Sequence, residues 1–208
     1  MNSQAIRIII FAGLLSPLVS LGQVNLLQNP SFDFSSSESA ERPADWEIFS
    51  DEGIFGEVTL VSGMAQDGDK SLKFSFSQPD PSDQWRGFGI SQIISAREND
   101  TLVFSGYFRP RNNLYLPPKA FASLRIDWIG LKEGNESYVI SSSSISSIGI
   151  ATIDSQEWRR FELKAKAPEG TTEAKVIVSV HPRSAASGGV FVDHLSLNST
   201  TEFETAPE

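Results

Sequence analysis

The feature that most constrains the fold is a succession of short runs in which apolar and polar residues alternate, each bounded by turn residues. The clearest run is Ser71–Ser77, where Leu72, Phe74 and Phe76 share one parity and polar residues share the other. A period of two places every second side chain on the same face of a β-strand. No window shows the 3.6-residue period that would predict a helix.

Runs of this kind predict about ten strands. Besides Ser71–Ser77, the expected strands cover residues 46–49, 56–61, 87–95, 101–109, 120–129, 158–165, 175–180 and 190–197. The serine-rich stretch 141–147 is interpreted as a connection. Turns rich in Gly, Pro and Asp at a spacing of roughly 8–15 residues are typical of sandwiches and barrels. We therefore predict an all-β fold, a jelly-roll β-sandwich of two antiparallel sheets.

The first 22 residues do not belong to this pattern. Arg7 precedes an apolar run from Ile8 to Leu21, and small residues up to Gly22 suit cleavage by a signal peptidase. This run is too short to span a membrane, and no later stretch approaches the ~18 apolar residues that a span needs. We expect a secreted protein, extracellular or periplasmic, cleaved near Gly22. One domain would cover residues 23–197, and residues 198–208 would form a disordered acidic tail.

The composition excludes several kinds of site and partner. The sequence has no cysteine, which excludes disulfides, thiolate metal sites and a cysteine nucleophile. The formal net charge is −9, and loss of Arg7 with the leader would make it −10. Such a charge disfavours nucleic acid and anionic membranes as partners, whereas neutral sugars and cations remain compatible. We expect a monomer.

A series of short motifs resembles the landmarks of one family. In chain order they are Asn29–Asp33, Pro43–Trp46, Gly68–Phe74, Gly89–Gln92, Phe104–Arg109, Trp158–Phe161 and Gly189–Leu197. Together they resemble the carbohydrate-binding modules of families 4, 9 and 22, which are galactose-binding-like jelly rolls. The resemblance runs from Asn25 to Leu197. It implies a module that binds a poly- or oligosaccharide on the concave face of one sheet.

The resemblance also implies a structural Ca²⁺ on the convex side of the sandwich. By position, the implied ligands are Asp33, Asp67 and Asp193, with the carbonyl groups of Ser31 and Lys70. Ca²⁺ takes about six to eight oxygen ligands and mixes carboxylates with carbonyls, which agrees with this set. Simpler interpretations stay open: Asp193 is a strand residue that faces water, and Asp67 is a turn residue.

A sugar site needs an aromatic platform together with planar polar groups. The candidate ligand-binding residues are Trp85, Gln92, Tyr107, Arg109, Tyr115, Arg125 and Asp127. Trp85 and Tyr115 are the candidate platforms, and Gln92 lies where the family often places a ligand-contacting glutamine. Alternatively, Trp85 packs in the core and Arg109 forms an exposed ion pair with Asp127. We expect Trp46, Trp128 and Trp158 in the core.

No motif of a known catalytic site is evident. Neither His181 nor His194 is predicted to form a nucleophile–base pair with a serine, and the Gly-X-Ser-X-Gly and His-Glu-X-X-His motifs are absent. No pair of carboxylates stands out for glycoside hydrolysis. The first hypothesis is therefore a non-catalytic carbohydrate-binding module. The alternatives are a secreted adhesive or structural sandwich that binds protein or matrix and, less favoured, a small polysaccharide-cleaving jelly-roll enzyme.

Overall fold

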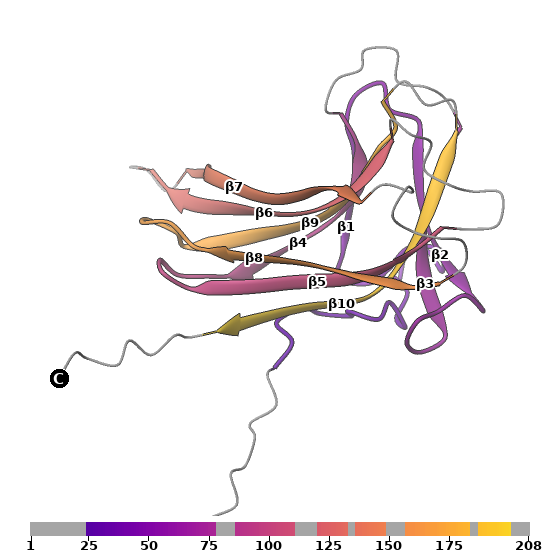
Figure 1. Cartoon of the computed structure of the whole chain (residues 1–208), viewed down its shortest axis with the longest axis horizontal. Helices are drawn as coiled ribbons and strands as arrows, with labels where there is room; N and C mark the ends of the chain where they lie inside the picture. Colours follow the sequence, from indigo (N-terminus) through magenta and orange to yellow (C-terminus); the bar gives the residue numbers. More distant parts are fainter. Residues whose placement is uncertain are drawn as a thin grey trace, which may run out of the picture.

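Two five-stranded antiparallel sheets pack face to face in a computed structural model, which describes residues 24–77, 86–110, 120–132, 136–148, 157–183 and 187–200 (Figure 1). The first sheet has the order β1-β4-β9-β6-β7 and the second has the order β2-β3-β10-β5-β8. The strands are β1 (Glu47–Ser50), β2 (Gly56–Ser62), β3 (Lys70–Phe76), β4 (Phe88–Ser95), β5 (Thr101–Arg109), β6 (Phe121–Leu131), β7 (Ser137–Ile148), β8 (Arg159–Lys166), β9 (Glu173–His181) and β10 (Gly188–Thr200). This is the expected all-β jelly-roll sandwich. The described residues include no helix that could cross a membrane.

The strand β7 corrects the sequence interpretation, because residues 141–147 form part of this strand and not a connection. It lies at the edge of the first sheet and pairs only with β6. Most of its serines are exposed, so no apolar alternation marks them as strand. The last strand also extends to Thr200, three residues beyond the expected end. The predicted leader and residues 201–208 lie outside the described residues.

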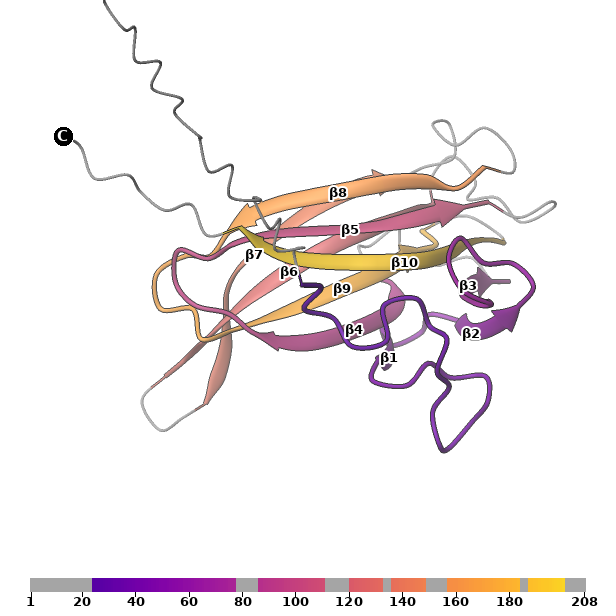
Figure 2. The ribbon, with the colours of Figure 1, turned by 90° about the horizontal axis from the view of Figure 1, so that it is seen from below.

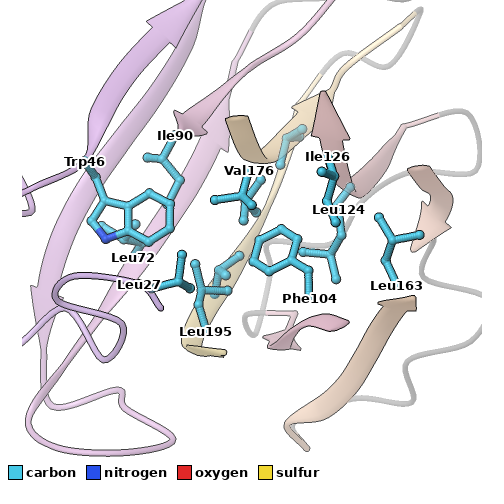
Figure 3. Close-up of a cluster of buried hydrophobic side chains, with 14 of the residues drawn as sticks. Leu27, Trp46, Leu72, Ile90, Phe104, Leu124, Ile126, Leu163, Val176 and Leu195 are labelled. Carbon is cyan, nitrogen blue, oxygen red and sulfur yellow. The ribbon is translucent and has the colours of Figure 1, made fainter. Parts of the chain in front are cut away.

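The core fills the space between the sheets with one parity of side chains from each strand. Figure 3 shows Leu72 and Phe104 of the second sheet facing Ile90, Leu124 and Val176 of the first. Trp46 and Trp128 are buried as predicted. Trp158 was wrongly expected in the core. It is half-buried, and the Arg109 guanidinium lies over its ring, 6.0 Å from the centroid, because both side chains point away from the core.

The N-terminal segment runs along β10, so the two ends of the described chain lie side by side (Figure 2). The Leu26 amide donates to the Leu197 carbonyl at 2.8 Å, and the Leu195 amide donates to the Pro30 carbonyl at 2.9 Å. The Asn25 side chain also donates to the Leu195 carbonyl and accepts from the Leu197 amide. In a protein without cysteine, these hydrogen bonds hold the ends of the domain together.

Candidate functional site

The first sheet turns a mainly polar set of side chains away from the core. Its strand register places Ser123 beside Ser179 and Asp127 beside Lys175, all on the parity opposite to the core residues. We call this surface the serine face, and its members are Ser91, Phe121, Ser123, Arg125, Asp127, Ser142, Lys175, Ile177, Ser179 and His181. Arg125 and Asp127 are the two predicted ligand-binding residues that the structure places here.

A hydrogen-bonded cluster occupies one end of the serine face. The Oγ atoms of Ser123 and Ser179 lie 2.8 Å apart, and Ser179 Oγ lies 2.9 Å from His181 Nε2. The Phe121 ring stacks on the imidazole with centroids 4.6 Å apart. All four residues are buried although they point away from the core. Because each hydroxyl can donate or accept, the two serines and the imidazole satisfy one another within this buried cluster.

The charges of the serine face are paired. Arg125 Nε lies 3.1 Å from Asp127 Oδ1, and the hydroxyl of Ser142 donates to that same oxygen at 2.6 Å. Farther along, Lys175 Nζ lies 3.2 Å from Glu47 Oε2, and this ammonium holds the pKa of Glu47 below its usual value. Asp127 therefore pairs with Arg125 and not with Arg109, contrary to the sequence-based alternative. The paired charges suit an uncharged ligand.

An aromatic ring lies at the β1 edge of this face. Phe49 of β1 pairs with Gly89 of β4, and the register continues from Gly89 to Ser179 and then to Ser123. A Cβ atom on Gly89 would lie 2.1 Å from the Val178 carbonyl oxygen and 3.1 Å from the Phe49 ring. Because Gly89 has no side chain, nothing projects from the sheet at its position in this cross-strand row. Phe49 lies at one end of the row and the hydroxyl cluster lies at the other.

Gln92 is turned away from the serine face and anchors the N-terminal segment. Its Oε1 accepts from the Gln28 amide at 2.9 Å, and its Nε2 donates to the carbonyl groups of Asp45 and Gln28 at 2.8 and 3.2 Å. The side chain lines a cavity of about 500 Å³ at the edge of β4, together with residues such as Leu26 and Ile94. Its amide is already hydrogen-bonded to the protein, so the structure gives it a structural role.

The structure does not bring the predicted sugar-binding residues together. Tyr107 and Arg109 project from β5 in the second sheet, on the face of the sandwich opposite to Arg125 and Asp127. The core separates the two groups. Trp85 and Tyr115 lie outside the described residues. The cluster was missed because Ser123 reaches Ser179 only through the register of β6 and β9, although Ser179 and His181 lie two residues apart on one strand.

The predicted ligands Asp33, Asp67 and Asp193 lie around one turn at a corner of the second sheet. Asp193 has 0% of its surface exposed, so it does not face water. Its Oδ2 accepts from the amides of Gln66 and Asp67 at 2.6 and 3.0 Å, and its Oδ1 accepts from the His194 amide at 2.7 Å. Burial raises the pKa of Asp193 above its usual value, although these three hydrogen bonds act in the opposite direction.

Asp33 and Asp67 flank the same turn. Asp33 Oδ1 accepts from the Asp69 amide at 3.1 Å, while the Lys70 ammonium donates to the Asp33 carbonyl at 2.9 Å. Asp67 Oδ2 accepts from the Ser31 hydroxyl at 3.1 Å and lies 3.3 Å from His194 Nδ1. These oxygen donors suit Ca²⁺ in kind. Within the described ranges, however, no three acidic or histidine side chains converge on one point, so calcium stays a prediction.

The fold is similar to that of proteins of known structure. No protein-family model matches the sequence, and no curated protein sequence is similar to it. Among solved structures, TmCBM61 in complex with β-1,4-galactotriose matches with a TM-score of 0.52 at 19% identity, over 85% of this chain and 99% of that one. The fold is the jelly roll of carbohydrate-binding modules. At this identity the likeness establishes the fold and not the narrower assignment to families 4, 9 and 22.

Enzymes share this jelly roll. A cyclase from Fischerella sp. TAU matches with a TM-score of 0.59 at 14% identity, over 85% of this chain and 97% of the cyclase. The enzymatically active domain of bacteriophage CBA120 tailspike protein 4 matches with a TM-score of 0.58 at 14% identity, over 85% of this chain. This chain spans about a fifth of the length of that tailspike structure, 21%.

These matches correct the expectation that the chain is non-catalytic. That expectation depended on the absence of known catalytic motifs and on the resemblance to binding modules, but solved structures of cyclases have the same fold. The structure also corrects the statement that no histidine pairs with a serine, because His181 Nε2 is hydrogen-bonded to Ser179 Oγ. The two residues belong to no sequence motif, so motif searches could not detect the pair.

Proposed function

We propose that the serine face binds a neutral oligo- or polysaccharide. The observation that carries this proposal is a polar outer surface whose charges are paired, with the half-buried Phe49 ring at its β1 edge. A sugar presents hydroxyl groups at its rim and C–H groups on its ring faces, so its site must offer hydrogen bonds and apolar surface together. The fold shared with a galactotriose-binding module supports the same class of ligand.

The proposal includes export of the protein, since the predicted leader from Arg7 to Leu21 would place the domain among extracellular or periplasmic glycans. A catalytic role is the second candidate, and the 2.9 Å contact between Ser179 Oγ and His181 Nε2 favours it. A serine activated by an adjacent base is a common nucleophile. Release of reducing ends or unsaturated products from a bound glycan would identify this role.

The ion pair of the serine face provides a direct test of sugar binding. We expect the variant Arg125→Gln/Asp127→Asn to bind its neutral glycan at least about tenfold more weakly. A tenfold change in Kd corresponds to about 1.4 kcal/mol of binding free energy, which is the size of one good polar contact. Affinity electrophoresis or calorimetry against β-glucans, xylans and β-1,4-galactans measures the change. Both partners are replaced, so no unpaired charge remains.

The matched control for this variant is Arg160→Gln/Glu162→Gln, which removes an ion pair of 2.7 Å from the opposite face of the sandwich. This control should bind the glycan as the wild type does. Equal losses in the two variants, or the absence of binding to every neutral glycan tested, would contradict the proposal.

We further propose that the corner formed by Asp33, Asp67 and Asp193 holds a structural Ca²⁺, with the Ser31 and Lys70 carbonyl groups as additional ligands. The burial of Asp193 and the raised pKa of its carboxyl group support this, since no ammonium or guanidinium group of the described chain pairs with it. A bound divalent cation would supply positive charge at this carboxylate. It would also connect the N-terminal segment to β10.

Thermal melts test the metal separately from the sugar. We expect EDTA to lower the melting temperature by several degrees relative to a sample with excess Ca²⁺, because a ligand that binds only the folded state stabilises it. Asp33→Asn should lose this response, whereas Glu52→Gln, an exposed change of equal charge, should retain it. Identical melts with EDTA and Ca²⁺ would count against a calcium site.

A further inference from the structure

A second polar surface lies on the outer face of the second sheet. The register places Phe191 of β10 between Lys73 of β3 and Arg109 of β5, and Arg109 lies against Trp158, the residue before β8. We call these four residues the basic row. Neighbouring strands are about 4.8 Å apart, so the two cationic residues start about 10 Å from each other on either side of one ring.

Phe191 faces away from the core, yet only 3% of its surface is exposed. Lys73 and Arg109 flank it in the register and are themselves half-buried. Long cationic side chains commonly lay their aliphatic stems over an apolar surface and keep the charged end in water. Phe191 therefore acts as a support that holds the ammonium and guanidinium groups in place at the surface.

The cations of the basic row differ from those of the serine face in how they are paired. Neither Lys73 nor Arg109 forms an ion pair in the described part of the chain, whereas Arg125 and Lys175 on the serine face both do. Two cations on one row without an ion-pair partner among the described residues stand out in a protein with a net charge of −9. The contrast between the two faces indicates that they suit ligands of different charge.

Trp158 contributes a hydrogen-bond donor and an indole ring to this surface. Its Nε1 atom is buried and donates no hydrogen bond to the described chain. A buried donor without an acceptor costs about 1–3 kcal/mol, so an acceptor supplied by a ligand would offset that cost. The half-buried indole ring beside Arg109 also offers an apolar surface next to a positive charge.

We propose that the basic row binds an acidic polysaccharide through the carboxylate groups of its uronate residues. A uronate ring combines an anionic group, which suits Arg109 and Lys73, with a C–H face that suits the Trp158 ring. The net charge of −9 opposes the approach of any polyanion, so attraction has to come from this row, and the uronate C–H face beside Trp158 favours an acidic polysaccharide over nucleic acid or an anionic membrane. A narrow row of cations is more compatible with a single polymer chain. This site is separate from the serine face and does not depend on it.

The test uses the full-length protein with polygalacturonate as the probe and its fully methyl-esterified form as the neutral counterpart. We expect the wild type to bind polygalacturonate at low salt and to release it at about 1 M salt, where the Debye length is about 3 Å. Lys73→Gln/Arg109→Gln should bind at least about tenfold more weakly. The control Arg42→Gln/Lys132→Gln removes two exposed cations elsewhere and should bind within about twofold of the wild type.

Several outcomes would overturn the proposal. These are no binding by the wild type, equal losses in the two double variants, equal binding of the esterified polymer, or tighter binding to vesicles that contain anionic lipid. The conservative variant Lys73→Arg should retain binding, which separates a charge requirement from a folding defect. Binding of neutral glycans should not change in Lys73→Gln/Arg109→Gln, so this result is independent of the function proposed for the serine face.

Discussion

Replacement of Asp193 by alanine is expected to lower the free energy of unfolding by about 3 kcal/mol or more, since the amides of Gln66, Asp67 and His194 would lose their acceptor. For a domain of this size, each kcal/mol shifts the melting temperature by about 2–4 °C, so we expect a decrease of about 6–12 °C. Urea titration and a thermal melt measure the two quantities.

The control for this prediction is Asp69→Ala, because Asp69 is an exposed carboxylate of the same turn and its side chain makes no hydrogen bond within the described chain. Its effect should remain within about 0.5 kcal/mol. Burial raises the pKa of Asp193 in the folded state, so its charge opposes folding as the pH rises through that pKa. Asp193→Asn keeps an acceptor without the charge and should therefore cost less than alanine. A cost below about 1 kcal/mol for Asp193→Ala would show that Asp193 does not anchor the turn at Gln66 and Asp67 to β10.

Replacement of Gln92 by alanine is expected to lower the free energy of unfolding by about 2–3 kcal/mol, without a change in affinity for a neutral glycan. The substitution removes three hydrogen bonds to the backbone of Gln28 and Asp45 and leaves their partners partly buried. Denaturant titration measures the stability, and calorimetry measures the affinity.

Gln28→Ala is the matched control for Gln92→Ala, because the Gln28 side chain is exposed and only its backbone contacts Gln92. Stability should be nearly unchanged in this control. If Gln92→Ala instead weakened glycan binding and left the stability intact, the sequence-based interpretation of Gln92 as a ligand contact would be restored.

The strands and the side each residue faces could be predicted from local alternation. The parity of Phe104 and Phe108 in β5 identifies core positions, and both residues are buried. The same logic places Arg109 on the outside of its own strand. It cannot show which sheet that strand joins, because strand pairing depends on residues far apart in the chain. Tyr107 and Arg109 were therefore grouped with Arg125 and Asp127, although β5 and β6 belong to different sheets.

Other parts of the site carried weaker signals. Gln92 shares its parity with Ile90 and Ile94, which are both buried. The sequence could therefore have predicted that the Gln92 side chain points toward the core side of the sheet. The strand β7 had no such signal, because its serines do not alternate with apolar residues. Ser123 and Ser179 are 56 residues apart in the sequence, and they become neighbours only through the register of β6 with β9. No local pattern contains that information.

The central position of β10 has a consequence for the order in which the molecule forms. β10 lies between β3 and β5, so these two strands cannot belong to one continuous sheet until the last segment of the chain has arrived. The contact of Asn25 with β10 joins residues 170 positions apart. Pairings between such distant segments form slowly, because the chain loses the entropy of closing a long loop before the stabilising contacts form. Assembly of this sandwich therefore waits for the C-terminal strand, and a chain interrupted before Gly188 would leave the second sheet as two separate halves.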